Sequence, residues 1–386
     1  MLFIKNGLIY TMNDEIVKNG SILIKDDKIT EVGKDIIAPL DAKVIDAEGR
    51  MVTPGFIEAH SHIGMHEESI GFEGNDVNEQ TNPITPELRA IDGINPMDEA
   101  FKEAYQAGIT TAITGPGSAN IIGGTFAAIK TYGHRIDDMI IKSPIAMKIA
   151  FGENPKRVYN SRKESPVTRM ATAAILRETL FKAQEYMEKK DNANDELEIP
   201  EFNIKMEALL PVLRKEIPLK AHAHRADDIF TALRIAKEFD VNITLDHCTE
   251  GHLITDDLAK EGKSAIVGPT LGNKSKFELK NKTFNTPKIL NEAGIKIAIT
   301  TDSPVIPLHY LSLCAGLAHK AGLEEIEALK AITINPAEIL GLEDRIGSIE
   351  PGKDADIVIF DGNPIKDIDY KTYKTIIDGK VVYEKK

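Results

Sequence analysis

The fold is decided by the stretch TPGFIEAHSH, residues 53–62. A Pro-Gly turn precedes apolar residues that end in two histidines one residue apart, which predicts a short buried strand. Residues i and i+2 of an extended strand point to the same face, so His60 and His62 can offer two imidazoles to one metal ion. An isolated His-x-His pair is weak evidence by itself, and only further ligands at other strand ends turn it into a predicted metal site.

After this stretch, short apolar segments alternate with segments of helical spacing, which is typical of a parallel sheet with crossover helices. Eight such units between residues 55 and 342 predict an α/β fold, a (β/α)8 TIM-like barrel. The predicted strands are Phe56–His60, Thr110–Thr114, Thr125–Lys130, Ile145–Phe151, Leu219–His222, Ile243–His247, Ser264–Val267 and Lys296–Thr300. The predicted helices include Asn95–Ala107, one that begins at Ser165-Pro166, Ala226–Phe239 and His309–Ala321.

Both ends of the chain instead contain short strand-like segments separated by turn signals, among them Asn6-Gly7 and Asn19-Gly20. Strand-rich sequence on both sides of a barrel indicates one β domain built from both termini. We therefore predict a small β-sandwich domain from residues 1–54 and 343–386, and the barrel over residues 55–342.

Two polar segments interrupt the barrel pattern. Residues 65–95 are rich in Glu, Asn, Pro and Gly and follow the His-x-His strand, so they are predicted to form a long loop over the active face. Residues 191–202 are acidic and turn-rich, which predicts an insertion or a mobile connection. Substrate specificity is expected to lie in loops such as 65–95 and 152–164.

Composition excludes several classes of partner. Hydrophobic residues make up 42% and charged residues 28% of the 386 residues, as in an ordinary soluble globular protein. The net charge of −13 argues against nucleic acid, because phosphate binding needs a basic face. No apolar run approaches the roughly 18 residues of a membrane span. Two cysteines, Cys248 and Cys314, cannot form a disulfide framework, so we expect a cytoplasmic protein. A small-molecule substrate is expected, and homo-oligomerisation stays open.

Polar side chains lie at the ends of several predicted strands. His222 and His224 end the fifth strand, His247 ends the sixth, and Asp302 ends the eighth, while Lys148 lies in the second half of the fourth. In a TIM barrel the carboxyl ends of the strands meet at one face, where active sites lie. Imidazoles and a carboxylate gathered there fit Zn²⁺ or a similar divalent ion.

These residue types suit hydrolysis. Neutral imidazoles hold a metal without cancelling its charge, and such a metal lowers the pKa of bound water from about 15.7 to about 7. The carboxylate of Asp302 could bind the metal and accept the proton of that water. A lysine ammonium is no metal ligand, but Lys148 carboxylated by CO₂, as N6-carboxylysine, would present a bridging carboxylate.

The chain resembles the metal-dependent amidohydrolase superfamily, in the group of imidazolonepropionase-like and metallo-dipeptidase-like enzymes. The resemblance implies a distorted (β/α)8 barrel, a β-sandwich from both termini and one or two divalent metals. It also implies that His60 and His62 bind the more buried metal, that His222 and His247 bind the second, and that Asp302 binds the first and acts as general base. It is carried by Pro54–His62, Gly108–Thr111, His222, His247, Asp302, Asn335–Ala337, Gly347–Ile349 and Gly352–Asp356.

Some assignments stay open at this point. The bridging ligand of the superfamily is a carboxylated lysine or a glutamate, and both Lys148 and Glu153 have suitable positions. The resemblance requires a single histidine at the end of the fifth strand, but this chain has both His222 and His224 there. His224 could therefore contact substrate or support a metal ligand. Arg225 or Arg157 could hold a substrate carboxylate.

The leading functional hypothesis is hydrolysis of a C–N bond in a linear or cyclic amide, by attack of a metal-activated hydroxide. A dipeptidase or carboxypeptidase is an alternative that would use Arg225 or Arg157. An amino-heterocycle deaminase is another, but relatives with that activity tend to carry an acid three residues after the fifth-strand histidine, where this chain has Arg225. A non-catalytic scaffold is a fourth hypothesis, which the complete set of candidate ligands disfavours.

Overall fold

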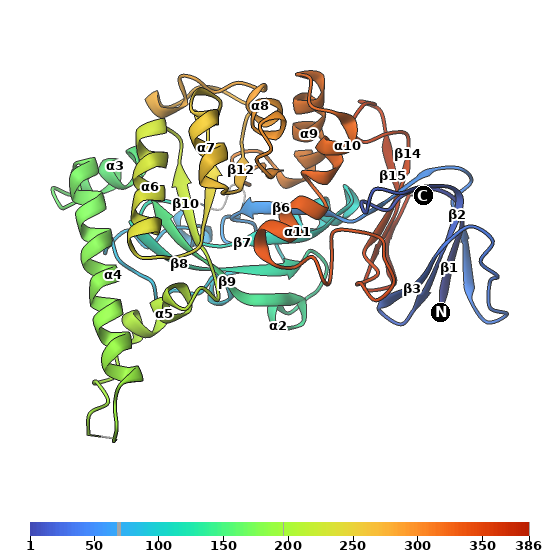
Figure 1. Ribbon diagram of the computed structural model, residues 1–386. Coiled ribbons are helices and arrows are strands. Elements are labelled where there is room, and N and C mark those ends of the chain that lie inside the picture. Colours follow the sequence, from blue (N-terminus) through green and yellow to red (C-terminus); the bar gives the residue numbers. More distant parts are fainter. Residues whose placement is uncertain (68–70, 196, 386) are drawn as a thin grey trace.

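Two eight-stranded sheets organise the protein, one forming a barrel and the other joining the two termini. The computed structural model describes residues 1–67, 71–195 and 197–385. The terminal strands lie together at one end of the molecule, and the long helix α4 (Arg169–Asp191) projects beyond the barrel at the other end (Figure 1). The predicted fold class is confirmed.

The barrel strands follow one another in sequence order around the sheet. All eight lie where the sequence predicts them, as β6 (Phe56–Ser61), β7 (Ile109–Thr114), β8 (Ile122–Lys130), β9 (Ile140–Ala150), β10 (Leu219–Ala223), β11 (Ile243–His247), β12 (Ala265–Val267) and β13 (Ile297–Ile299). The two end strands approach each other, because Thr300 Oγ1 donates to His60 O at 2.6 Å and His62 N donates to Ser303 O at 2.7 Å. The barrel is therefore nearly closed where the histidine strand meets the last strand.

The expectation of an entirely parallel sheet is wrong for the third strand. β8 pairs antiparallel with both β7 and β9, whereas the other neighbouring barrel strands pair in parallel. The physical reason is the short connection 115–121, which cannot hold the crossover helix that a parallel pair requires.

Helices cover the outside of the barrel (Figure 1). The helix predicted to begin at Ser165-Pro166 begins instead at Arg169, because the hydroxyl of Thr168 accepts a hydrogen bond from Ala171 N at 3.0 Å and so caps the first turn. Besides α4, the helices are α1 (Glu99–Gln106), α2 (Ile136–Met139), α3 (Glu153–Ser161), α5 (Ile204–Leu213), α6 (Ala226–Glu238), α7 (Thr255–Glu261), α8 (Thr286–Glu292), α9 (Leu311–Lys320), α10 (Glu325–Lys330) and α11 (Ile334–Leu340).

The terminal sheet joins the two ends of the chain through β5. This strand pairs in parallel with β1 and antiparallel with β14, with Val52 opposite Ile359. Buried aliphatic side chains from both ends, including Ile4 and Ile357, form one core beneath it. The strands are β1 (Leu2–Tyr10), β2 (Ile16–Lys25), β3 (Lys28–Gly33), β4 (Lys43–Asp46), β5 (Met51–Pro54), β14 (Ile357–Asp361), β15 (Lys371–Ile377) and β16 (Lys380–Glu384).

The two Asn-Gly pairs near the N-terminus are bulges inside long strands, so their prediction as turns is wrong. Asn6 and Asn19 have φ of 55° and 52°, and Gly7 lies opposite Gly20 at register shifts between β1 and β2. A Cβ on Gly20 would lie 2.6 Å from Ile9 Cδ1. The glycines therefore let the two strands bend together without a clash.

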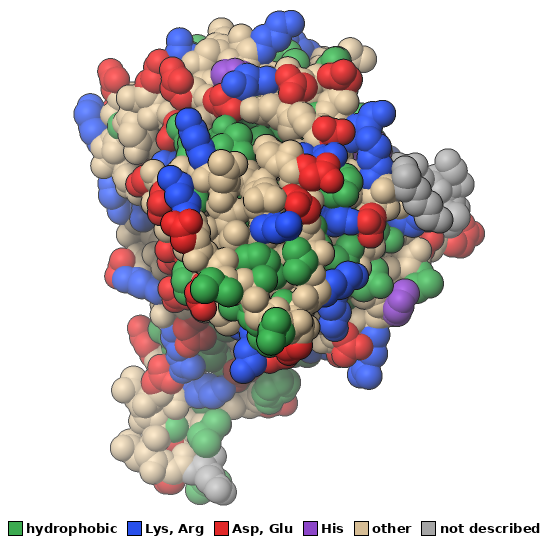
Figure 2. Space-filling view, turned by 90° about the vertical axis from the view of Figure 1, so that its right-hand side faces the viewer, with side chains coloured by type: hydrophobic (Ala, Val, Ile, Leu, Met, Phe, Trp, Pro, Cys, Tyr) green, Lys and Arg blue, Asp and Glu red, His purple; other side chains and the backbone are tan. Residues whose placement is uncertain are grey.

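The side of the molecule at which the terminal sheet lies carries a mixed surface. Figure 2 shows hydrophobic side chains gathered near the middle of this face, with acidic and basic side chains interspersed around them. On this face the basic side chains are not collected into a patch of the kind that phosphate binding requires. Among the described helices, none is long and apolar enough to cross a membrane.

A buried ion cluster attaches the barrel to the terminal sheet. The ammonium of Lys130, on β8, lies 2.6 Å from Asp356, 3.0 Å from Asp354 and 3.0 Å from Asp378. Burial alone would lower the pKa of Lys130, but the three carboxylates more than offset this effect and raise it. The lysine thus stays charged and neutralises acids that come from the C-terminal segment.

We predict that Lys130→Met lowers the free energy of unfolding by about 3–5 kcal/mol, because it leaves the buried carboxylate of Asp356 without its cation. Chemical denaturation followed by circular dichroism measures the change. Lys18→Met, at an exposed position on β2, is the control and should change stability by less than about 0.5 kcal/mol. Equal stability of the two variants would contradict the role given to this cluster.

Candidate metal centre

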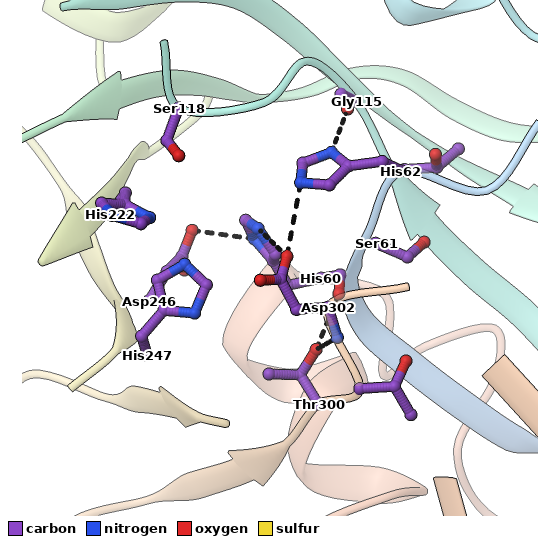
Figure 3. A network of polar contacts seen from close by, with 12 residues as sticks. His60, Ser61, His62, Gly115, Ser118, His222, Asp246, His247, Thr300 and Asp302 are labelled. Atoms are coloured by element: carbon purple, nitrogen blue, oxygen red, sulfur yellow. Dashed lines mark hydrogen bonds and ion pairs between the residues drawn. The ribbon is translucent and has the colours of Figure 1, made fainter. Parts of the chain in front are cut away.

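One group of candidate ligands joins the first and last strands of the barrel. His60 and His62 lie at the end of β6, and Asp302 follows β13. Asp302 Oδ1 lies 3.5 Å from His60 Nε2 and 3.3 Å from His62 Nε2 (Figure 3). The donor atoms of the three residues all lie within 4.8 Å of one another, so one cation could contact them all.

Hydrogen bonds and ion pairs orient these rings. His62 Nδ1 lies 2.6 Å from Gly115 O, in the short connection between β7 and β8. Because a carbonyl can only accept, Nδ1 carries the proton and Nε2 keeps its lone pair for a metal. His60 Nδ1 contacts Asp246 Oδ2 at 2.9 Å, which likewise turns Nε2 toward Asp302 (Figure 3).

A second group consists of three histidines from β10, β11 and the residue that follows β10. Donor atoms of His222, His224 and His247 lie within 4.8 Å of one another, and all three residues are buried. His247 Nδ1 lies 2.7 Å from Gly268 O, so its Nε2 is the unprotonated nitrogen. His224 Nδ1 lies 2.8 Å from Thr249 Oγ1. This group brings together His222 and His247, as the resemblance implies, and adds His224 to them.

A left-handed backbone conformation orients two of these side chains, those of His247 and Asp302. Asp246 and His247 are adjacent on β11, and strict alternation would send them to opposite faces. His247 has φ of 71°, which turns the chain, so that both residues contact other members of the site. Asp302 has φ of 54°. Non-glycine residues rarely adopt this conformation, and it is concentrated at functional sites.

Of the two candidates for the bridging ligand, Lys148 is the one that contacts a histidine of the site. Its Nζ lies 3.2 Å from His60 Nε2, and its side chain is fully buried. Burial, opposed by Asp246 and Asp302, lowers the pKa of Lys148 to about 8. Glu153 lies at the start of α3, where its Oε1 accepts a hydrogen bond from Glu278 N at 2.9 Å.

The two arginines considered for substrate binding do not line the cavity at the metal centre. Arg225 makes a bidentate contact with Asp227, 2.9 Å at each bond, where α6 begins. Arg157 lies on α3, and its side chain is 63% exposed. The structure therefore does not gather them with the histidines.

Several buried charged residues of the site were missed in the sequence, among them Asp246, Lys220 and Glu58. Asp246 accepts from Lys220 Nζ at 3.0 Å, and Glu58 accepts from His60 N at 3.0 Å and Thr301 N at 2.9 Å. Burial raises the pKa of Glu58 although these hydrogen bonds act against it. A signal for Glu58 was available, because it alternates with His60 and His62 on one face of the strand.

The donor set fits a divalent cation. Asp302 Oδ1 is buried and has no hydrogen-bond partner among the described residues. Burial alone would raise the pKa of Asp302, but His247, His62 and Lys148 more than offset this effect and lower it. A buried carboxylate oxygen without a partner is costly, and a cation between it and the imidazoles would satisfy it. His60, His62 and Asp302 thus form one buried candidate metal site, and His222, His224 and His247 form another.

A cavity of about 450 Å³ opens over both groups. Its wall includes His62, His222, His247 and Asp302, so a small molecule in it would meet both candidate sites. This volume lies in the range of pockets for small ligands.

We predict that the metal-free protein loses stability as the pH falls from about 7.5 to about 5. Burial lowers the pKa of His60, His222 and His247 well below the ordinary value and that of His224 to about 4. Between these values and about 6.5, the unfolded chain binds more protons than the folded chain, so unfolding becomes easier as the pH falls. The melting temperature of chelator-treated protein measures this loss.

His224→Gln should reduce the loss of melting temperature between the two pH values, whereas His134→Gln, at an exposed position, should leave it unchanged. A metal-free protein that melts at the same temperature at both pH values would contradict the expectation.

Known proteins are similar to this chain in architecture and in sequence. The profile of the amidohydrolase family matches residues 51–382. The crystal structure of an amidohydrolase from Thermotoga maritima MSB8 is 44% identical, covers 100% of both chains and superposes with a TM-score of 0.96.

Two curated relatives extend the comparison. The amidohydrolase TasK of Hapsidospora irregularis is 32% identical over 376 residues, which are 90% of this chain but only 38% of TasK. The imidazolonepropionase of Streptococcus sanguinis is 26% identical over 389 residues, 93% of this chain and 87% of that enzyme. The chain belongs to the amidohydrolase family of metal-dependent hydrolases.

Proposed function

We propose that this protein hydrolyses a C–N bond in a linear or cyclic amide of a small molecule, with divalent metal at the histidine groups. The observation that carries the proposal is the bare, buried oxygen of Asp302, which faces both His60 and His62 and borders the cavity. The relative named imidazolonepropionase supports it, since an imidazolone ring is a cyclic amide.

The histidines that would hold the metals are buried, and the side chain of Asp302 is 14% exposed. His60, His62 and Asp302 would hold one ion, and His222 and His247 would hold a second. Imidazole nitrogens with a carboxylate oxygen favour zinc. When bound, such an ion lowers the pKa of a water molecule to about 7 and polarises a carbonyl group.

Asp302 would act as the general base and then the general acid. Its pKa is lowered, so the side chain is a carboxylate at neutral pH and can accept the proton of the attacking water. The same carboxyl can then deliver this proton to the leaving nitrogen. Since Oδ1 faces both histidines and would bind the metal, the other carboxylate oxygen would carry the proton.

Lys148 would supply a bridging carboxylate once CO₂ has reacted with it. In that reaction the neutral amine attacks the carbon of CO₂, a N–C bond forms and one amine proton leaves. With a pKa of about 8, Lys148 is a neutral amine in a substantial fraction of the molecules near physiological pH. The 3.2 Å contact with His60 favours Lys148 over Glu153 for this role.

The alternatives have less support. Deaminases of this superfamily tend to carry an acid three residues after the fifth-strand histidine, but here Arg225 stands there and pairs with Asp227. A dipeptidase would use the same chemistry with a cation to hold the free carboxylate; Arg225 and Arg157 lie outside the cavity wall, so neither arginine supports that role. We also propose a cytoplasmic location, because Cys248 and Cys314 are buried free thiols.

Asp302→Asn should lower kcat by roughly 10²- to 10⁴-fold, because the amide cannot accept the proton of water. Initial rates on a panel of N-acyl amino acids, dipeptides and cyclic amides, with Zn²⁺ or Mn²⁺ and bicarbonate, measure the effect. Circular dichroism should show an unchanged fold, and Asp92→Asn, at an exposed position, serves as the control. Full activity of Asp302→Asn would rule out its role as the base.

Lys148→Met should lower the metal bound per chain, because the variant cannot form the bridging carboxylate. Mass spectrometry of the metal content, after reconstitution with Zn²⁺ and bicarbonate, measures the loss. Lys156→Met, on α3, is the matched control and should keep the full metal content. Unchanged metal content in Lys148→Met would refute the bridging role.

A further inference from the structure

Charge is distributed unevenly around the cavity at the metal centre. The chain has a net charge of −13, yet the charged side chains of the cavity wall are Lys148, Lys276, Lys282 and Asp302. Lys148 and Asp302 belong to the metal centre. Lys276 and Lys282 are therefore the charged side chains of this wall that could bind a part of the ligand away from the metal centre.

Lys282 has no acid to neutralise it. Its ammonium donates to Gly272 O at 3.0 Å and Asn273 O at 3.2 Å, and no carboxylate of the described residues lies within 4.0 Å of it. An ammonium has three donors, so one N–H remains for a ligand. A cation without a counter-charge in the wall of a concave site favours an anionic occupant.

Lys276 is held in place beside the second histidine group. Its ammonium donates to Asn154 Oδ1 at 2.7 Å and lies 3.6 Å from Glu278 Oε1. Glu278 Oε1 in turn lies 3.7 Å from His224 Nε2 and 3.9 Å from His222 Nε2. Lys276 therefore lies close to the metal centre while still bordering the cavity.

The loop that carries both lysines is anchored to α3. Glu278 N donates to Glu153 Oε1 and Glu153 N donates to Glu278 Oε2, both at 2.9 Å. Lys274 Nζ further ties the loop to itself through Lys280 O at 2.7 Å. The two cavity lysines are thus fixed before a ligand arrives, which reduces the entropy cost of binding.

We propose that the substrate carries a carboxylate group and that Lys276 and Lys282 bind it. The substrate class is then N-acyl amino acids and cyclic amides that bear a carboxylate. Glu278 takes up one charge of the lysine pair, so one net positive charge remains, which matches a carboxylate better than a doubly charged phosphate. Leu271, Leu279 and Ile306 of the same wall would contact the apolar part of the substrate. This inference rests on the proposed hydrolase function.

The test compares each amide substrate as its free carboxylate and as its neutral N-methylamide. In Lys282→Met the KM for the carboxylate should rise roughly tenfold or more, because a charge-assisted hydrogen bond is lost. The KM for the N-methylamide should change less than about twofold, and kcat should be nearly unchanged for both. Lys276→Met should behave in the same way.

Lys280→Met is the matched control. It removes one charge from the same loop, but Lys280 is exposed, lies over the ring of Phe277 and does not border the cavity. Its KM values should equal those of the unchanged protein for both members of every pair. An equal effect of Lys280→Met and Lys282→Met on the carboxylates would overturn the inference.

A second readout separates this inference from the proposed function. The rise in melting temperature on adding each carboxylate to the zinc-loaded protein reports binding without turnover. If the carboxylates bind, lose this effect in Lys282→Met and are not hydrolysed, the carboxylate site at the two lysines stands and the proposed function fails. If N-methylamides bind and react as well as carboxylates, or if no carboxylate of the panel binds, the inference fails. Hydrolysis of the N-methylamides would leave the hydrolase function intact.

Discussion

The buried carboxylate of Asp246 connects the residues of the candidate metal centre. One of its oxygens accepts from Lys220 at 3.0 Å, while the other lies 2.9 Å from His60 and 3.9 Å from Lys148. It thereby links β6, β9, β10 and β11 through a single side chain with no exposure to solvent. Without it, two ammonium groups and an imidazole would share a buried space with less negative charge to balance them, and such an arrangement is unfavourable.

The surroundings of the histidines keep their rings in the neutral, oriented state that metal binding requires. Burial keeps the rings of His60, His222 and His247 neutral, and backbone carbonyls fix the protonated nitrogen of His62 and His247. The carbonyl for His62 comes from the connection between β7 and β8. The antiparallel third strand therefore contributes to the site, because its short connection passes directly beside β6.

Much of the fold could be predicted, because it depends on local patterns. The eight barrel strands and the β character of both termini follow from apolar periodicity and turn residues. One error arose where tertiary contacts overrode a local signal, and another where a second local signal prevailed. Asn6-Gly7 and Asn19-Gly20 look like hairpin turns, but they lie opposite each other as bulges in two paired strands. Ser165 has the properties of a helix cap, yet Thr168 provides the cap in the folded chain.

The sequence by itself determined which strands carry imidazoles and carboxylates, since the side chains at His60, His62, His222, His247 and Asp302 stand at the ends of apolar segments. Only the tertiary structure decided what surrounds them: Asp246 and Lys148 against His60, Thr300 and Thr301 against Glu58, and lysines in place of arginines in the cavity wall. The physical reason is that strand identity is set by neighbours in the chain, whereas these contacts join residues more than 80 positions apart. They exist only once barrel closure brings distant strand ends together.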